Sequence, residues 1–204
     1  MAGKTQEPST RRGIERRESL LAAARKVFER DGYIAARITD ICDAAGVASG
    51  TFYTYFADKE EAFDAVFAAA EEEMLHPHLS EQAAGGGPRA KIEAANRGYL
   101  LSYRRNAKLM AVINQVAAVN DHYRDLMRKR SEAFARRNAR SIERLQAEGL
   151  ADPSLDPYQA SRALSAMVSR TAFTTYVLGE QVPLEVLVRT LTDLWVNALR
   201  IPPD

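Results

Sequence analysis

The chain has 204 residues, of which 46% are hydrophobic and 27% are charged. This length and composition predict one or two domains with a real hydrophobic core, and they argue against a disordered or disulfide-stapled chain. The 28 Lys and Arg residues nearly balance the 27 Asp and Glu residues, which excludes a global electrostatic attraction to nucleic acid or membranes. Any charge-driven partner must therefore be bound by a local patch.

The first thirteen residues are polar and lack the apolar stretch of a signal peptide, and no apolar run approaches the roughly 18 residues of a membrane-spanning helix. The single cysteine, Cys42, cannot form an internal disulfide, which suits a reducing compartment. We therefore expect a soluble, cytoplasmic protein with no membrane partner. Residues 1–13 are expected to form a disordered basic arm. Because residues 1–17 contain five Lys or Arg against two Glu, this end favours contact with phosphates.

Apolar residues recur at three- and four-residue spacing along the chain, and no segment shows the sustained alternation of a β-strand. This pattern predicts an all-α fold of about nine helices. Seven helices are expected over residues 14–30, 49–56, 89–105, 107–119, 121–147, 157–178 and 184–199. Two more are expected between them: a short helix that follows Thr39 and is stopped by Gly46, and a helix that a capping box at residues 58–61 opens and that ends at residue 75.

The second and third of these helices are short and are joined at Gly46. Thr39 is expected to cap the second helix with its hydroxyl, and Phe52 and Phe56 of the third helix are expected to face inward as an i, i+4 pair. Two such helices, with a preceding helix beneath them, have the spacing of a helix-turn-helix. That unit places its second helix in the major groove of DNA.

Residues 38–60, ITDICDAAGVASGTFYTYFADKE, resemble the signature of the TetR/AcrR family of bacterial transcriptional regulators. The resemblance extends over about residues 16–67. It implies a helix-turn-helix DNA-binding domain over residues 14–58 and a ligand-binding and dimerisation domain over residues 59–204. Two positions depart from the family pattern, since Ala48 stands where many members have a capping serine and Ser49 where many have a basic residue.

The resemblance also implies roles in DNA binding. Thr39 and Tyr53 are expected to contact phosphates, and Lys59 is expected to contact the DNA backbone from the start of the fourth helix. Arg37 is placed for another phosphate contact. The candidates for contacts with bases are Ser49, Gly50, Thr51, Thr54 and Tyr55. Taken singly, Thr39 is equally a helix cap, the tyrosines can cover the small core and Lys59 can be a solvated charge, but the set at these spacings favours DNA.

The C-terminal helices combine apolar stripes with a few polar groups, aromatic rings and methionines, a lining typical of a small-molecule pocket. Members of the family bind small molecules in this domain, so the resemblance implies a small, largely apolar effector. The candidate lining residues are Tyr99, Tyr103, Met110, Ile113, Asn114, Phe134, Met167, Thr171 and Thr174.

The last two helices carry apolar residues on two faces, which predicts that they pack against their copies in a two-fold homodimer. A fully buried helix within a monomer is the alternative. The helix over residues 121–147 is rich in arginine, but acidic residues are interspersed with the basic ones. A solvated helix with ion pairs accounts for that composition.

No catalytic residue, metal or cofactor is expected. Glu73 and His76 have the spacing of half a di-iron motif, but no second copy of the step occurs, and the chain has no nucleophile elbow or P-loop. We therefore predict a regulator that is not an enzyme. It would act as a repressor, bind a palindromic double-stranded DNA operator as a homodimer, and be released by its effector. A dimeric small-molecule-binding protein whose helix-turn-helix is structural, and an activator, remain as alternatives.

Overall fold

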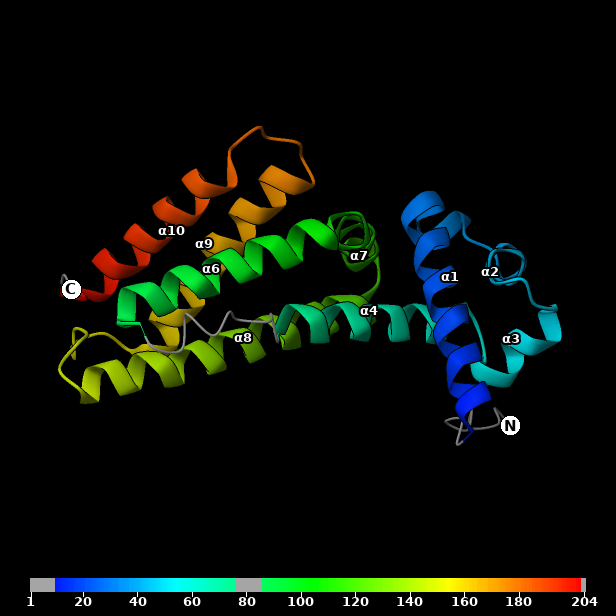
Figure 1. Ribbon diagram of the computed structural model, residues 1–204, viewed down its shortest axis with the longest axis horizontal. Coiled ribbons are helices and arrows are strands. Elements are labelled where there is room, and N and C mark those ends of the chain that lie inside the picture. Colours follow the sequence, from blue (N-terminus) through cyan, green and yellow to red (C-terminus); the bar gives the residue numbers. More distant parts are fainter. Residues whose placement is uncertain (1–9, 76–85, 203–204) are drawn as a thin grey trace. The chain divides into compact units, whose positions relative to one another are not determined.

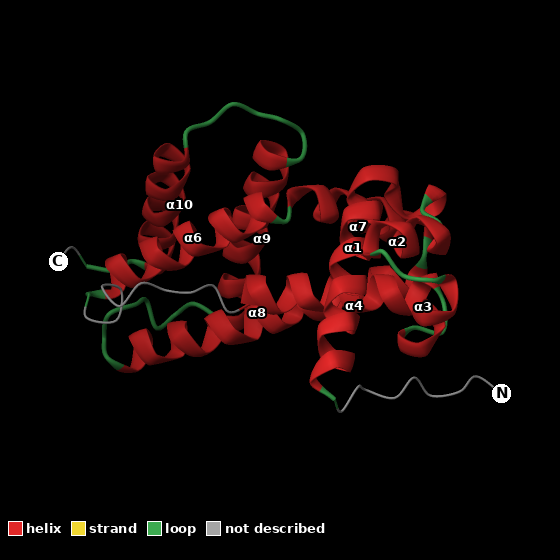
Figure 2. Cartoon of the chain, turned by 45° about the vertical axis from the view of Figure 1, so that its right-hand side comes forward, coloured by secondary structure: helices red, strands yellow, loops and turns green. Residues whose placement is uncertain are grey.

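The computed structural model describes residues 10–75 and 86–202, and within these residues the chain forms nine α-helices and no β-strand (Figure 1, Figure 2). The prediction of an all-α fold is confirmed. In chain order the helices are α1 (Arg11–Ala35), α2 (Ile38–Ala45), α3 (Ser49–Tyr55), α4 (Lys59–Leu75), α6 (Pro88–Arg105), α7 (Ala107–Val119), α8 (Asp121–Ala147), α9 (Pro157–Tyr176) and α10 (Leu184–Leu199).

The chain separates into two compact units. The first contains the residues up to Glu72 together with Lys108–Val119, and the second contains Glu73–Ala107 and the residues from Asn120 onward. The expected functional division into residues 14–58 and 59–204 is a different one, and it stays a prediction.

Helix α1 starts earlier than the sequence predicts. It begins at Arg11 rather than Ile14, because the hydroxyl of Thr10 accepts a hydrogen bond from the backbone N–H of Gly13 at 3.2 Å. Residues 10–13 therefore belong to a capped helix and not to a disordered arm. The rest of the expected arm, residues 1–9, lies outside the described residues.

The end of α1 also differs from the prediction. Gly32 has a φ of 75° and a ψ of 171°, so the regular helix breaks there, close to the expected end at residue 30. A further turn follows and reaches Ala35, and the N–H of Ala36 donates to the carbonyl of Gly32 at 3.3 Å. This extra turn leads directly into α2.

The first unit has a core of aromatic and aliphatic side chains from α1 to α4. Phe28 of α1, Phe52 and Phe56 at α3, and Phe63 of α4 are all buried. The rings of Phe28 and Phe63 meet edge to face with their centroids 4.8 Å apart, and those of Phe52 and Phe56 lie 5.5 Å apart. The prediction that Phe52 and Phe56 face inward is confirmed.

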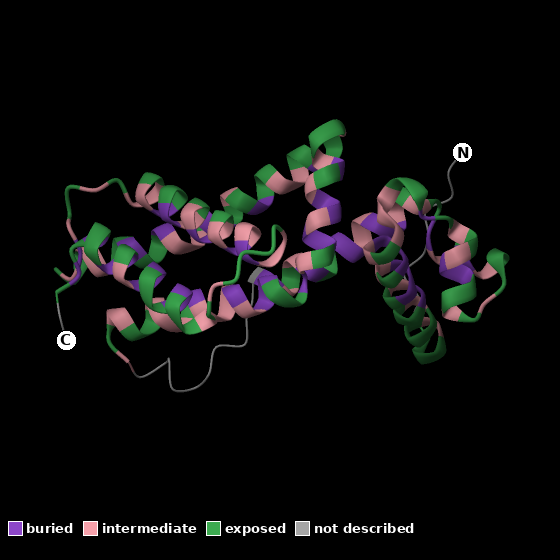
Figure 3. Ribbon diagram, turned by 90° about the horizontal axis from the view of Figure 1, so that it is seen from above, coloured by how far each residue is buried: buried purple, intermediate pink, exposed green. Residues whose placement is uncertain are grey.

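In the second unit, α8 packs against α9, and α6 packs against α10 and α9. Polar contacts hold these helices in register: the Ser161 hydroxyl donates to the carbonyl of Ala135 at 2.7 Å, and Arg97 binds the carboxylate of Glu185 through two nitrogens. Figure 3 shows buried and exposed residues alternating along the helices, as expected when each helix has one face in the core.

Candidate nucleic-acid interface

The turn between α2 and α3 has the geometry that the sequence predicts. Gly46 ends α2 in the left-handed conformation, with a φ of 66° and a ψ of 37°, which a residue with a side chain rarely adopts. Its N–H donates to the carbonyl of Asp43, and the N–H of Val47 donates to that of Cys42 at 3.0 Å. These two bonds close the end of α2 and direct the chain into α3 three residues later.

Helix α3 has one buried and one exposed face. Phe52 is buried, as is Phe56, which follows the last residue of the helix. On the opposite side Ser49, Gly50, Tyr53 and Thr54 are exposed, whereas Thr51 and Tyr55 are half-buried at the edges. All six residues were predicted to face DNA, and α3 therefore presents hydroxyl groups and a glycine to the solvent.

Local contacts position several of these groups. The ring of Tyr53 lies edge-on to that of Phe52 with a centroid separation of 5.6 Å, so its hydroxyl is held outward. The Thr54 hydroxyl donates to the carbonyl of Gly50 at 3.4 Å. Ser49 shares a hydrogen bond with the buried thiol of Cys42, whose pKa is raised by burial against the smaller, opposing effect of that bond.

The start of α2 departs from the prediction. Arg37, not Thr39, is the N-cap residue, because its carbonyl accepts hydrogen bonds from the N–H groups of Asp40 and Ile41. The expectation that the Thr39 hydroxyl caps this helix is wrong, since Thr39 lies inside the first turn. Both Arg37 and Thr39 are exposed, and no side chain caps the helix.

Helix α4 opens with the predicted capping interaction. The Asp58 carboxylate accepts from the N–H of Glu61 at 2.8 Å, and the Glu61 carboxylate accepts from the N–H of Ala57 at 2.5 Å. Lys59, the first residue of the helix, does not extend into solvent. Its ammonium group donates to three backbone carbonyls at the end of α1, those of Tyr33, Ile34 and Ala36, at 2.8, 3.2 and 3.0 Å.

Helix α1 carries several basic side chains in its first turns. Arg11, Arg12 and Arg16 are exposed there, and Arg11 pairs with Glu15 at 2.9 Å. Arg17 is half-buried and lies over the ring of Phe56, with 5.4 Å between its Cζ and the ring centroid. Sequence reasoning missed this contact, because no periodic pattern connects residues so far apart in the chain.

The predicted effector-binding residues fall into both compact units. In the second unit, Tyr99 lies 5.9 Å from Tyr103 and 5.6 Å from Phe134 between ring centroids. Burial raises the pKa of Tyr103 to about 12. Met167, Thr171 and Thr174 are half-buried on α9 in the same unit, and the Thr174 hydroxyl donates to the carbonyl of Thr171 at 3.1 Å.

The other three predicted lining residues, Met110, Ile113 and Asn114, lie on α7 and belong to the first unit. Met110 and Ile113 are buried. The Asn114 amide donates to the carbonyl of Met110 at 2.7 Å, within its own helix. The structure therefore groups Tyr99, Tyr103 and Phe134 by contact, while the α7 residues are part of a different core.

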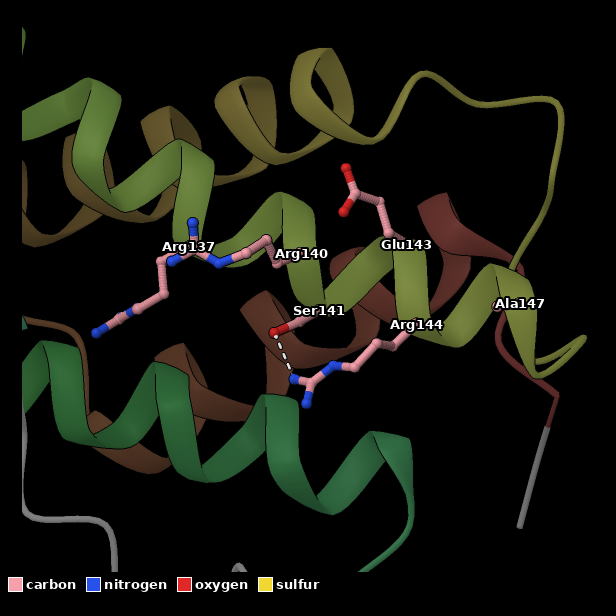
Figure 4. Close-up of a pocket in the computed structure, with 6 residues that line it drawn as sticks. All are labelled: Arg137, Arg140, Ser141, Glu143, Arg144 and Ala147. Carbon is pink, nitrogen blue, oxygen red and sulfur yellow. Dashed lines mark hydrogen bonds between the residues drawn. The ribbon is translucent and has the colours of Figure 1, made fainter.

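A surface pocket of about 530 Å³ lies along the C-terminal half of α8 (Figure 4). None of the predicted effector-binding residues lines it. Burial, and then the charge of Arg140, lowers the pKa of Arg137, and Arg144 donates to the Ser141 hydroxyl at 3.3 Å. The lining residues are Arg137, Arg140, Ser141, Glu143, Arg144 and Ala147.

Ion pairs on α8 are found in its N-terminal half, where Arg124 pairs with Asp121 and Arg128 pairs with Asp125 and Glu132. This agrees with the predicted solvated helix. Across residues 10–75 and 86–202 no group of three or more His, Cys, Asp or Glu residues could hold a metal ion. His76 lies outside the part that the structure describes. No helix in that part is long and apolar enough to cross a membrane.

Comparison with known proteins agrees with this geometry. Residues 20–66 match the family described as bacterial regulatory proteins, tetR family. The HTH-type transcriptional repressor KstR2 of Rhodococcus jostii is 34% identical over 79 residues, which are 39% of each chain. The uncharacterized HTH-type transcriptional regulator YhgD of Bacillus subtilis is 41% identical over 61 residues, which are 30% of this chain and 32% of YhgD. The matched part of the chain thus spans 39% of the length of KstR2 and 32% of the length of YhgD.

Two further comparisons cover nearly the whole chain. The HTH-type transcriptional regulator EthR of Mycolicibacterium smegmatis is 23% identical over 97% of this chain and 94% of its own. A putative TetR-family regulator from Rhodococcus sp. has a TM-score of 0.75 at 21% identity, covering 91% of this chain and 98% of that structure. At this identity the solved structure shows that the fold is shared.

Proposed function

We propose that this chain, whose residues 20–66 match the tetR family of bacterial regulatory proteins, is a repressor that binds a palindromic DNA operator as a homodimer. The observation that carries the proposal is the two-sided character of α3. Its aromatic core face is buried by the first unit, and its opposite face presents Tyr53, Thr54 and Gly50 to solvent. A helix of this kind fits the major groove of DNA.

In this proposal each exposed or half-buried polar group of the interface has a defined role. Hydroxyl groups donate to and accept from both base edges and phosphates, so Ser49, Thr51, Thr54 and Tyr55 read bases while Tyr53 contacts a phosphate. Gly50 lets the helix backbone approach the DNA closely. Arg37 and Thr39 bind the phosphate backbone from the exposed start of α2, and Arg17 does so from α1.

Homodimerisation through α9 and α10 is supported by apolar surface on these helices. Val186 and Leu194 of α10 are exposed, and so are the small apolar residues Ala163 and Ala166 of α9. In such a dimer each protomer contributes one copy of α3, the proposed recognition helix. The two copies, related by a two-fold axis, must lie about 34–36 Å apart to enter successive major grooves. A change in their separation therefore abolishes simultaneous docking.

The effector in this proposal is small and largely apolar. The rings of Tyr99, Tyr103 and Phe134 supply apolar walls, and the tyrosine hydroxyls and the threonines of α9 supply a few hydrogen-bonding groups. Effector binding is transmitted through α4, which belongs to the first unit up to Glu72 and to the second from Glu73. The repressor is released when α4 shifts the recognition helices.

The experiment that tests this function is the selection of bound duplexes from random DNA by the purified protein, at moderate and at high salt. The expected result is an enriched palindrome whose binding is lost at high salt, because phosphate contacts release counterions. The Tyr53→Phe variant removes one exposed hydroxyl without touching the core and should bind the enriched duplex more weakly. Tyr158→Phe, a half-buried tyrosine of α9, is the matched control.

Other outcomes contradict the proposal. If no duplex is enriched, either DNA binding requires a ligand or the helix-turn-helix is a structural unit of a small-molecule-binding protein. If a duplex is enriched but Tyr53→Phe binds it with unchanged affinity, the Tyr53 hydroxyl makes no contact with DNA. An enriched duplex that increases transcription from an adjacent promoter identifies an activator instead of a repressor.

A further inference from the structure

We propose that Lys59 is a positioning residue, which fastens the start of α4 to the turn between α1 and α2 and so sets where α2 and α3 lie, rather than a residue that contacts a DNA phosphate. This inference rests on the proposed DNA-binding function. It concerns the first compact unit, within which all the participating residues lie.

The ammonium group of Lys59 has a complete set of partners inside the protein. A lysine ammonium carries three N–H donors, and three backbone carbonyls accept from it at 2.8–3.2 Å. Its nitrogen also lies 4.8 Å from the centroid of the Tyr33 ring, within the range of a cation–π interaction. A phosphate oxygen would have to displace one of these carbonyls, which would then lose its hydrogen bond.

The charge of Lys59 is suited to α1 and not to its own helix. A positive charge at the first residue of α4 opposes that helix's dipole, whose N-terminal end is already positive. The three carbonyl oxygens beyond the break at Gly32 carry partial negative charge, so they stabilise the ammonium. The break at Gly32 makes this possible, because the turn after it holds the carbonyls of Tyr33, Ile34 and Ala36 within reach of one nitrogen.

The ring that covers the ammonium is itself held between two helices. Tyr33 stacks against Phe28 of α1, with 6.0 Å between centroids, and lies 4.8 Å from Phe63 of α4. Phe63 is one turn after Lys59 on the same helix. Lys59 and Phe63 thus attach the first turns of α4 to the end of α1 by a polar and an apolar contact.

The attachment lies directly before the DNA-facing residues. Ala36, one of the three carbonyl partners, precedes Arg37, the N-cap residue of α2. Any displacement of the start of α4 therefore moves the start of α2, and through the Gly46 turn it also moves α3. Lys59 acts on DNA binding through the backbone of residues 33–36.

The test compares three variants of the full-length protein on the duplex obtained by selection, with the dissociation constant measured across a salt series. Lys59→Met removes the ammonium and keeps the length of the side chain. Lys59→Arg keeps the charge, but its planar fork does not place three donors on one nitrogen. Arg37→Met removes an exposed charge beside the attachment and is the control for a lost phosphate contact.

We expect Lys59→Met and Lys59→Arg to weaken operator binding by at least about fivefold, the lower end of the usual coupling between sites. The slope of log K against log salt should be the same as in the wild type. Arg37→Met should make that slope shallower by about 0.9, as expected for one lost phosphate contact. A shallower slope in Lys59→Met, together with full affinity in Lys59→Arg, would show a phosphate contact and overturn the proposal.

A purely structural role predicts a different result, in which Lys59→Met melts at a lower temperature but binds the operator with unchanged affinity when folded. That result also overturns the proposal. If the wild type selects no duplex, the DNA-binding function itself has failed, and the attachment is then tested by hydrogen exchange without DNA. In Lys59→Arg or Lys59→Met the amides of Ala36, Asp40 and Ile41 should exchange faster, while those of α6 and α9 stay unchanged. Unchanged exchange at all these amides contradicts the attachment.

Discussion

Arg17 of α1 lies over the ring of Phe56, the residue that follows the end of α3, with its guanidinium carbon 5.4 Å from the ring centroid. Phe56 is buried, so the ring is fixed and in turn holds the half-buried arginine beside the C-terminal end of the recognition helix. The contact brings a positive charge from the first helix to the edge of the proposed DNA interface.

Replacing Arg17 with Met should therefore weaken DNA binding and make the slope of log K against log salt shallower by about 0.9, because one phosphate contact is lost. Loss of the cation–π contact should lower the free energy of unfolding by only about 0.5–1 kcal/mol. Fluorescence anisotropy over a salt series and urea unfolding measure the two effects. Arg124→Met, an exposed arginine of α8, should change neither quantity, and an unaltered slope in the Arg17 variant would argue that this arginine serves only the core.

Gly50 offers a way to separate folding from DNA binding. A Cβ atom added there meets no atom within 4 Å, so the fold has room for alanine. Gly50→Ala should keep or raise the free energy of unfolding, by up to about 1 kcal/mol, because alanine favours a helix more than glycine does. Operator binding should weaken by about 1–3 kcal/mol, the usual cost of one lost base contact.

Ser131→Ala, an exposed position of α8, is the matched control for the Gly50 variant and should leave DNA binding unchanged. Binding of Gly50→Ala at wild-type strength would mean that the backbone of α3 does not approach the DNA closely at this residue.

Leu194 of α10 tests the proposed dimer, because its side chain is 45% exposed on one of the two helices assigned to the interface. Leu194→Glu should convert the protein to a monomer in sedimentation velocity, since burying an unpaired carboxylate at an apolar interface is costly. Operator affinity should fall with it, because a palindrome needs two linked recognition helices. Val119→Glu, at an apolar residue of α7 that is 79% exposed, should remain a dimer. A dimeric Leu194 variant would place the interface elsewhere.

Tyr103 predicts a specific loss of stability at high pH. Burial raises the pKa of Tyr103 to about 12, whereas an unfolded tyrosine ionises near pH 10. The folded state thus keeps the proton while the unfolded state loses it, so stability is intact below pH 10 and falls as the pH rises toward 12, by roughly 2–3 kcal/mol in total.

Urea unfolding at pH 9 and pH 11 measures this effect. Tyr103→Phe has no proton to lose at this position, so its stability should fall less between the two pH values than that of the wild type. Tyr53→Phe, which alters an exposed tyrosine, should behave as the wild type does. An equal fall in the wild type and in Tyr103→Phe would show that the Tyr103 hydroxyl ionises as readily in the folded state as in the unfolded one.

Much of the fold follows from local signals in the sequence. Asp58 caps α4, Gly46 ends α2 and Pro157 begins α9, as predicted, because a cap or a helix break depends on residues only a few positions away. The buried face of α3 was predictable for the same reason, since Phe52 and Phe56 are one helical turn apart. Thr39 shows the limit of such signals: the N-cap residue is Arg37, so the helix begins two residues earlier than a cap at Thr39 indicates.

Contacts between distant residues were decided only by the tertiary structure. The sequence shows that Lys59 starts α4, but only the packing of α1 against α4 brings the carbonyls after Gly32 to its ammonium group. Likewise the sequence shows an arginine at position 17, but only the tertiary structure brings the ring of Phe56 to it. In the same way, the apolar stripes of the C-terminal helices predict that Tyr99 and Met110 both line the effector pocket. The packing of the helices assigns these two residues to different compact units. Helical periodicity specifies which face of a helix is apolar, because it depends on the geometry of a single helix. It does not specify which other helix covers that face, because that depends on the fit of all the side chains in the core.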